Sequence, residues 1–272
     1  MPLYIIGTPI GNLSDFSIRA IDIIKASDVI LCESIERIRV ILEHFKIRDK
    51  KIITYREENR KRINEEVLQY LKEGKVISLL SDAGMPSISD PGGYLINAAL
   101  ENKIELHPVP GPTAFATALS LSGFDTREAV FLRFLPRRRV EIEEIIEFYR
   151  TRDAILVFYE SPYRILHTLK IISEIDPSST LFIAREMTKQ FEELIRDTPE
   201  NLIKAFSNRE IKGEITVVMK PSPKGLKAQY DSRLVEIMRK EGIKTKSIAK
   251  IISEYYNIPA RSIYNEIIQE KD

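Results

Sequence analysis

Short runs of β-branched and apolar residues alternate with longer amphipathic stretches along most of this chain, and no other feature restricts its fold as strongly. In the first half, the pattern predicts strands at residues 3–7, 29–32, 51–55 and 76–81. It predicts helices between them at residues 17–27, 33–46 and 59–73. Such alternation is typical of βαβ units, so we expect an α/β protein built on a mainly parallel sheet.

The pattern restarts after Gly123 and predicts a second α/β lobe. Its predicted strands are residues 130–135, 154–159, 180–184, 191–196 and 214–219. Residues 221–225 then have the composition of a linker, and three short amphipathic helices are predicted beyond them. We therefore divide the chain into an N-terminal lobe (residues 1–122), a C-terminal lobe (residues 123–223) and a helical tail (residues 224–272).

Four prolines are expected to mark the starts of helices, each directly after a capping residue. The pairs are Asp90-Pro91, Gly111-Pro112, Ser161-Pro162 and Thr198-Pro199. Each pair follows a predicted strand or turn. The helix N-termini would then gather at strand ends, where open α/β sheets bind their ligands.

The composition is that of an ordinary globular protein. Hydrophobic residues make up 43% and charged residues 30% of the 272 residues, and no apolar run approaches the length of a membrane span. The N-terminus runs directly into a predicted strand without a signal-peptide pattern, and the single Cys32 excludes an internal disulfide framework. We therefore expect a cytoplasmic protein.

Three loops rich in small residues follow predicted strands and are candidates for ligand binding, because small residues let the backbone approach a ligand closely. The first, residues 7–13, does not fit the dinucleotide-binding pattern G-x-G-x-x-G, since Pro9 stands in place of the second glycine. The second, residues 81–93, contains Asp82, whose carboxylate can accept hydrogen bonds from ribose hydroxyls or an amine. The third spans residues 109–114. Each loop alone is also compatible with a purely structural turn.

The sequence contains neither a pattern typical of a metal site nor one typical of a serine hydrolase. His44, His107 and His167 share no ligand spacing with one another or with Cys32, so we expect no metal site. A G-x-S-x-G nucleophile elbow is also missing from the sequence.

Charge is distributed unevenly although the net charge is only +1. The tail carries 10 Lys and Arg against 7 Asp and Glu, and a second basic cluster contains Arg133 and residues 137–139. Such clusters favour an anionic partner, but a charged run is also typical of a solvated face.

Seven segments occur together in an order that is typical of one family. They are LYIIGTPIGNLSD, SLLSDAGMPSISDPG, HPVPGPTAFATALSLSG, FLPRR, VFYESPYR, AREMTKQFEE and GEITVV. With these motifs the chain resembles the tetrapyrrole-methylase superfamily over nearly its whole length, and most of all its ribosomal branch, the 16S rRNA (cytidine-2′-O)-methyltransferases. The resemblance implies a two-lobed, non-Rossmann (class III) methyltransferase fold with a small C-terminal helical domain. It also implies a homodimer and S-adenosylmethionine bound in the cleft between the lobes.

The resemblance assigns cofactor binding by position. The residues are Pro9, Asp82, Ala83, Gly84, Ser87, Ile88, Thr113, Ala114, Tyr159, Glu160, Ala184, Arg185, Glu186, Gly213 and Glu214. The chemistry agrees, because S-adenosylmethionine carries an adenosine, a carboxylate and a sulfonium but no phosphate. Small-residue loops without a phosphate-binding loop suit such a ligand, and its carboxylate can lie at a helix N-terminus.

The implied reaction is methyl transfer to the ribose 2′-hydroxyl of a cytidine in small-subunit (16S) rRNA. The enzyme mainly positions the two reactants, and a general base can take the hydroxyl proton. The candidate bases are Glu186, Glu160 and Glu33, and Lys189 is the candidate to stabilise developing oxyanion charge. Each carboxylate is equally compatible with a surface or salt-bridged role. Two alternatives stay open: methylation of a small molecule, such as a tetrapyrrole precursor or a diphthine-type substrate, and an RNA-binding paralogue without catalysis.

The chain departs from the family pattern where the substrate is expected. Ser34, Ile35 and Glu36 replace the usual residues after the second strand, and Met85 replaces a threonine. Residues 55–59 also lack the usual histidines. These departures leave methyl transfer as the prediction and leave the RNA target open.

RNA contacts are predicted for the two basic regions. The candidates are Arg133, Arg137, Arg138, Arg139, Lys244, Lys246 and Arg261. Such side chains bind phosphates, which positions an RNA without reading its sequence. The tail helices have the order of a helix-turn-helix, and the alternative is that the tail serves dimerisation or packing.

Overall fold

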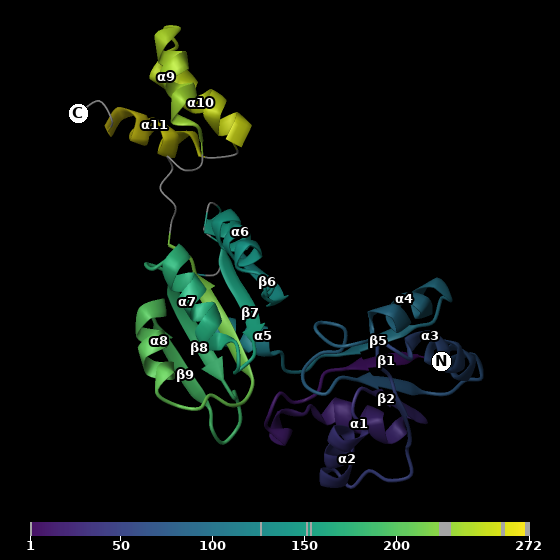
Figure 1. The fold of residues 1–272 in the computed structure, drawn as a ribbon. Helices are drawn as coiled ribbons and strands as arrows, with labels where there is room; N and C mark the ends of the chain where they lie inside the picture. Colours follow the sequence, from purple (N-terminus) through teal and green to yellow (C-terminus); the bar gives the residue numbers. More distant parts are fainter. Residues whose placement is uncertain are drawn as a thin grey trace.

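The computed structural model describes residues 2–125, 127–150, 152, 154–222, 230–256 and 259–269. Two sheets, each covered by helices, lie side by side and a bundle of three helices follows them (Figure 1). Among the described residues, no helix has the length and apolar character needed to cross a membrane.

The first sheet contains five parallel strands in the order β3-β2-β4-β1-β5. The strands are β1 (Leu3–Ile6), β2 (Val29–Cys32), β3 (Lys51–Thr54), β4 (Ile77–Leu80) and β5 (Leu106–Val109). The helices beside them are η1 (Leu13–Asp15), α1 (Ile18–Ala26), α2 (Ile35–His44), α3 (Arg60–Lys72) and α4 (Gly93–Glu101). These elements follow the predicted alternation to within a few residues at each end.

Both faces of the first sheet are buried, as its apolar strands predict. Ile30 and Cys32 of β2 belong to the core shared with α1 and α2. Their neighbours Val29 and Leu31 belong to the core shared with α3 and α4. Successive side chains of a strand point to opposite faces, so β2 can supply both cores only because all four of its residues are apolar.

The second sheet has the order β6-β7-β10-β8-β9 and is mixed. Its strands are β6 (Ala129–Phe134), β7 (Ile155–Glu160), β8 (Thr180–Arg185), β9 (Glu193–Asp197) and β10 (Ile215–Lys220). Only β6 and β7 pair in parallel, whereas β10 is antiparallel to β7 and β8, and β9 is antiparallel to β8. The expectation of a mainly parallel sheet is therefore wrong for this half. Periodicity reports which residues are buried, and it does not report the direction of the strand.

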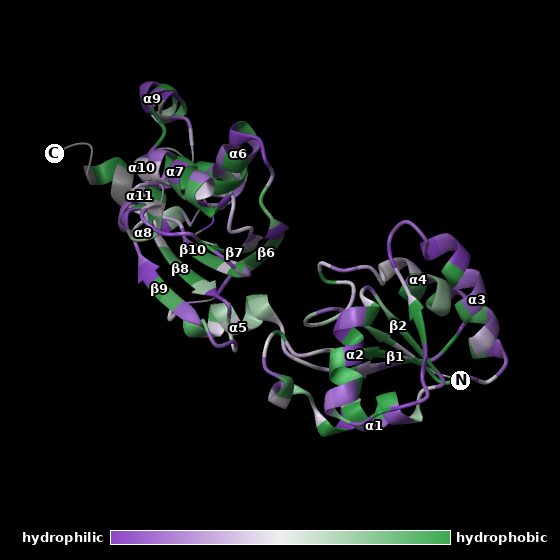
Figure 2. Cartoon of the chain, turned by 60° about the horizontal axis from the view of Figure 1, so that its bottom comes forward, coloured by the Kyte–Doolittle hydropathy of each residue, from purple (hydrophilic) through white to green (hydrophobic). Residues whose placement is uncertain are grey.

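Helices cover the second sheet on both faces (Figure 2). One face packs against α6 (Arg139–Arg150), α7 (Ile165–Ile175) and α8 (Pro199–Ser207). The opposite face packs against α5 (Ala114–Leu121), whose Ala118 is fully buried beside Val157 and Val218. Ile10, from the first loop, joins this same core and ties the two sheets together. The division of the chain after residues 122 and 223 stays a prediction. Helix α5 precedes the first of these boundaries in the sequence, yet it packs on the second sheet.

Only one of the four proline-marked helix starts is right. Helix α8 begins at Pro199 with Thr198 as its N-cap. Helices α4, α5 and α7 begin two or three residues later than expected. Pro162 lies in a turn before α7 instead, whereas Pro91 and Pro112 lie in irregular loop segments before α4 and α5. At α4 the reason is explicit, because Gly92 has φ +148°, which no helix contains.

The tail consists of α9 (Ser232–Lys240), α10 (Thr245–Tyr256) and α11 (Ala260–Gln269). All three lie beyond residues 221–225, where three short helices are predicted. Their apolar faces form a small core of their own that contains Ile248, Ile252 and Ile263. The linker residues 223–229 lie outside the described residues, but Ser222 directly before them is held in place. Its backbone N–H donates to Asp176 at 2.8 Å, and Arg150 donates to its hydroxyl at 3.1 Å.

Candidate active site

The three small-residue loops meet at the carboxyl ends of β1, β4 and β5. Thr8 and Gly84 exchange two backbone hydrogen bonds, of 2.9 and 3.1 Å, which join the first loop to the second. The first and third loops touch at two glycines. A Cβ on Gly111 would lie 2.7 Å from the backbone carbonyl of Gly7, so only glycines permit this approach.

A cavity of about 510 Å³ opens between these loops and the second sheet, which is an ordinary size for a small-molecule site. Nine of the fifteen predicted cofactor-binding residues line it: Ala83, Gly84, Ile88, Thr113, Ala114, Tyr159, Glu160, Gly213 and Glu214. A smaller adjoining cavity of about 210 Å³ is lined by predicted residues Pro9 and Asp82, and by Lys189. The loops and strand ends that the sequence singled out are therefore brought together, while the cofactor role of each residue stays a prediction.

Four predicted cofactor residues line neither cavity. Ala184 is buried in the core beneath α5. Arg185 is turned toward Glu193, to which its Nε donates at 2.8 Å. Ser87 lies in the second loop with φ +65°, and Glu186 lies directly after β8 with φ +51°. Of the candidate bases, Glu33 also lines neither cavity.

The cavity also contains residues that the sequence analysis did not select. They are Ile10, Met85, Ser89, Asp90, Phe134, Ser161, Pro162, Ile215 and Thr216. Most adjoin a selected residue, so the motifs could have been extended to include them. The residue farthest in sequence from any predicted cofactor residue is Phe134, which lines the cavity from β6 beyond a register shift in the pairing of that strand with β7. No local pattern predicts where such a shift falls.

Glu160 has both carboxylate oxygens occupied. Its side chain is fully buried, and it accepts hydrogen bonds from the Ser161 N–H at 2.8 Å and from the Thr168 hydroxyl at 2.6 Å. Arg164 lies 3.5 Å away. The carboxylate therefore holds the turn before α7 against the body of that helix.

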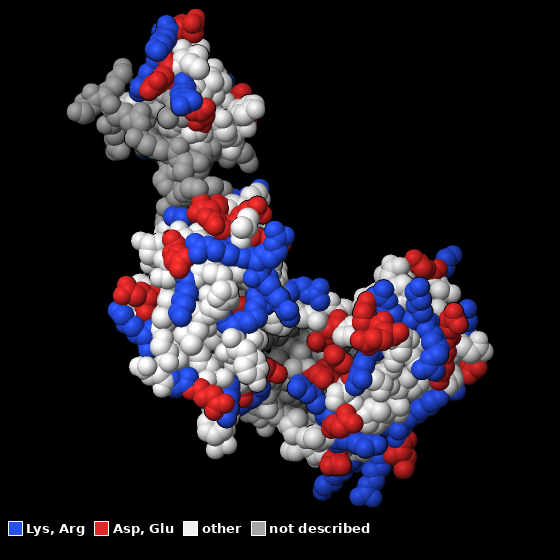
Figure 3. Space-filling view, in the orientation of Figure 1, with Lys and Arg blue, Asp and Glu red and all other residues white. Residues whose placement is uncertain are grey.

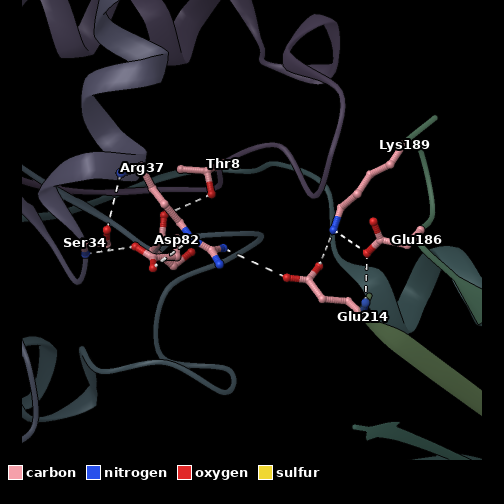
Figure 4. Close-up of polar contacts among 8 residues, drawn as sticks. Thr8, Ser34, Arg37, Asp82, Glu186, Lys189 and Glu214 are labelled. Carbon is pink, nitrogen blue, oxygen red and sulfur yellow. Dashed lines mark hydrogen bonds and ion pairs between the residues drawn. The ribbon is translucent and has the colours of Figure 1, made fainter. Parts of the chain in front are cut away.

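Glu186, Lys189 and Glu214 form a second hydrogen-bonded group (Figure 4). The Lys189 Nζ donates to Glu186 at 2.8 Å and to Glu214 at 3.0 Å, and the Glu214 N–H donates to Glu186 at 2.9 Å. Burial alone would raise the pKa of Glu186, but the hydrogen bonds from Lys189 and Glu214 outweigh it and lower that pKa. Burial likewise opposes the charge of Lys189, and its bonds to the two carboxylates raise its pKa overall. Glu186 and Lys189 are therefore both charged near neutral pH.

Arg37 connects the two halves of the site, and no pattern in the sequence indicates this. Its guanidinium lies 3.5 Å from Asp82 of the first half and 4.0 Å from Glu214 of the second (Figure 4). Ser34, one of the departures from the family pattern, has its N–H donating to Asp82 at 3.0 Å and also caps α2. Ser34, at which this chain differs from the family pattern, and Arg37 therefore hold Asp82 in position.

Asp90 lines the first-lobe wall of the main cavity, and the charges of Glu33 and Asp82 act on it. Burial raises the pKa of Asp90 to about 6, with a further contribution from the charges of those two carboxylates. Ser89, beside it, has a buried hydroxyl oxygen without a hydrogen-bond partner among the described residues. A buried hydroxyl without a partner in the wall of a cavity fits a polar ligand that supplies the missing hydrogen bond.

The predicted RNA-binding residues fall in two places. Arg133, Arg137, Arg138 and Arg139 are exposed on β6, the following turn and the start of α6. In Figure 3, blue side chains gather over β6 and α6 on the side that faces the first lobe. Arg138 is paired with Glu141 at 3.0 Å, and Arg139 is paired with Glu174. Lys244, Lys246 and Arg261 are exposed on the tail and belong to a separate surface.

The described part of the chain contains no group of three or more His, Cys, Asp and Glu side chains that could hold a metal ion.

Residues 2–203 match the family model of the Tetrapyrrole (Corrin/Porphyrin) Methylases. Among curated relatives, the Ribosomal RNA small subunit methyltransferase I of Hydrogenobaculum sp. is 42% identical over 80% of this chain and 95% of its own length. The protein of the same name from Thermotoga maritima is also 42% identical, over 80% of this chain and 97% of its own. That of Halalkalibacterium halodurans is 35% identical over 98% of this chain and 95% of its own, so it extends through the tail.

Solved structures show the same fold at low sequence identity. A diphthine synthase matches with a TM-score of 0.62 and 16% identity over 80% of this chain and 90% of that chain. A cobalt precorrin-4 methyltransferase matches with a TM-score of 0.61 and 16% identity over 80% of this chain and 94% of that chain. The resemblance inferred from the sequence motifs is thereby confirmed, as is the two-lobed α/β architecture. The chain belongs to the tetrapyrrole methylase family and is a methyltransferase that uses S-adenosylmethionine as its methyl donor.

Proposed function

We propose that this enzyme methylates the ribose 2′-hydroxyl of a cytidine in 16S rRNA. The observation that carries the proposal is the 42% identity, over 80% of the chain, with proteins named Ribosomal RNA small subunit methyltransferase I. The basic side chains beside the cavity, at Arg133 and residues 137–139, support an anionic substrate. We also propose a cytoplasmic homodimer, as the resemblance implies.

The residues of the cavity have two tasks in this reaction, to bind S-adenosylmethionine and to bring the acceptor hydroxyl to it. The donor supplies an activated methyl group on a sulfonium, so no acid or metal is needed to create a leaving group. We propose that the N-terminus of α5, at Thr113 and Ala114, and the loop containing Asp82 hold the donor. Glu214 pairs with Arg37 of the first lobe and with Lys189 of its own lobe, so this charged group joins the two lobes.

Among the candidates for proton transfer, Glu160 and Glu186 have their carboxylates engaged by N–H and O–H donors. For Glu186 the hydrogen bonds from Lys189 and Glu214 lower the pKa and weaken the group as a base, and for Glu160 they leave neither oxygen free to approach a substrate hydroxyl. We therefore propose positioning roles for them, with Lys189 held by two carboxylates and available to stabilise negative charge. Glu33 contributes charge to the first-lobe wall without lining the cavity.

Labelled S-adenosylmethionine should transfer its methyl group to small ribosomal subunits. Calorimetry in EDTA should show that the protein binds S-adenosylmethionine without a metal, and nuclease digestion of the methylated subunits should return the label as a 2′-O-methylated cytidine. Mass spectrometry of the nucleosides distinguishes ribose from base methylation. Label on a base would contradict the ribose assignment. Label in a small-molecule extract, but not in RNA, would favour the small-molecule alternative, and tight donor binding without any transfer would favour an inactive paralogue.

Changing Arg137, Arg138 and Arg139 together to alanine should weaken rRNA binding and flatten its salt dependence. For a single-stranded RNA, each phosphate that the protein no longer neutralises lowers the slope of log K against log salt by about 0.7, so a decrease of about 2 is the upper limit. The matched control changes Lys61, Arg62 and Lys72 of α3 to alanine, which removes the same charge from exposed positions of the first lobe. Equal slopes for both variants and the wild type would show that residues 137–139 form only a solvated helix start.

A further inference from the structure

The carboxylates that line the main cavity differ in what they contact. Glu160 is bound by Ser161, Thr168 and Arg164, and Glu214 by Lys189 and Arg37. Asp90 is also a cavity-lining residue, yet it forms no ion pair within 4.0 Å with any described residue. Of the three carboxylates that line the cavity, Asp90 is therefore the one whose charge is available to interact with a ligand.

The surroundings of Asp90 come from four elements packed around the cavity. Glu33 after β2 and Asp82 after β4 bring negative charge toward it, and the side chain of Ser81 is a hydrogen-bonding neighbour. The charge of Arg133, on β6 of the second sheet, has the opposite effect and lowers the pKa of Asp90. Tyr159 of β7 lies within its field as well: burial raises the pKa of this phenol, and the charge of Asp90 raises it further. Asp90 therefore lies between the lobes, where donor and acceptor must meet.

This environment makes Asp90 a stronger base than an ordinary aspartate. Burial and the two neighbouring carboxylates raise its pKa to about 6, so the group is mostly ionised at pH 7 to 8 but holds a proton more firmly than usual. Asp82 differs in its contacts, because the Ser34 N–H and Arg37 bind both of its oxygens.

We propose that Asp90 accepts the proton of the hydroxyl that is methylated, an inference that rests on the proposed ribose methylation. The hydroxyl oxygen forms a bond to the methyl carbon while the carbon–sulfur bond breaks and its electron pair stays on sulfur. The hydroxyl proton passes to the Asp90 carboxylate and from there to solvent. Below the pKa of Asp90 the carboxyl is already protonated and cannot accept it, so the rate falls as the pH is lowered through that value.

The test is Asp90→Asn, which keeps the shape of the side chain and removes its basicity. At saturating donor and ribosomal substrate, the single-turnover rate should fall at least about 100-fold, the lower range for a lost general base. Affinity for S-adenosylmethionine, measured by calorimetry, should stay within about threefold, since the charge acts on the acceptor. The matched control is Glu101→Gln, an exposed carboxylate on α4, which should react like the wild type.

A pH profile separates proton transfer from a merely structural role. The wild-type single-turnover rate should rise with pH to a plateau with an apparent pKa of about 6, Asp90→Glu should keep a rise of this form, and Asp90→Asn should lose it. An Asp90→Asn enzyme that reacts at the wild-type rate, or that loses only donor affinity, overturns the proposal. A wild type that methylates another atom overturns the proposed function itself, whereas ribose methylation at equal rates by both proteins overturns only the role of Asp90.

Discussion

Replacing Gly111 with alanine is expected to reduce the free energy of unfolding by about 3 kcal/mol, the upper range for overpacking a tight interior contact. The new Cβ would lie 2.7 Å from the carbonyl carbon and oxygen of Gly7. Both partners are backbone at the adjacent ends of β1 and β5, so neither can rotate out of the way. Because the first and third loops leave from these ends, donor binding should be lost as well. Urea denaturation and calorimetry with S-adenosylmethionine measure the two effects.

The control for Gly111 is Gly93→Ala. Gly93 is the first residue of α4, and a Cβ there would meet no atom within 4 Å. Alanine should be neutral or stabilise the protein by up to about 1 kcal/mol, because it restricts the unfolded chain and favours the helix. If both variants unfold at the same urea concentration, the contact between Gly7 and Gly111 is not the tight point that the structure indicates.

Removing residues 224–272 should leave the affinity for S-adenosylmethionine unchanged within about twofold and reduce kcat/KM for the ribosomal substrate by at least about 100-fold. The second figure corresponds to about 3 kcal/mol of lost substrate binding. No residue of the two cavities lies beyond Thr216, and the tail has a core of its own. The cut leaves Ser222 and its contacts with Asp176 and Arg150 in place. Donor calorimetry and methylation of small subunits are the measurements.

A full-length variant tests the surface of the tail without removing it. Changing Lys244, Lys246 and Arg261 to alanine alters exposed side chains only, so the helices should stay folded and ribosomal methylation should still fall. A truncated protein that methylates as well as the full chain would show that the tail does not bind RNA. Loss of donor binding on truncation would instead assign the tail to support of the lobes or of a dimer.

The sequence by itself determined the positions of most helices and strands and many of the residues that form the site. Apolar periodicity located the strands and most helices, because each element must bury one face or, as in β2 and β4, both. The small-residue loops were visible because a backbone that must approach a neighbour or a ligand needs glycine, as Gly7 and Gly111 show. The ordered motifs then identified the family, which the relatives confirm.

Only the tertiary structure decided how those elements combine. The direction of the strands in the second sheet depends on contacts between segments distant in sequence, which a local pattern does not contain. The same is true of α5, which packs on the second sheet although it belongs by sequence to the first lobe. The same holds for the chemistry of the site. Arg37 meets Glu214, and the charge of Arg133 acts on Asp90, only after the two sheets are placed side by side. A side chain's charge and basicity are set by such neighbours and by burial, and both are properties of the folded molecule.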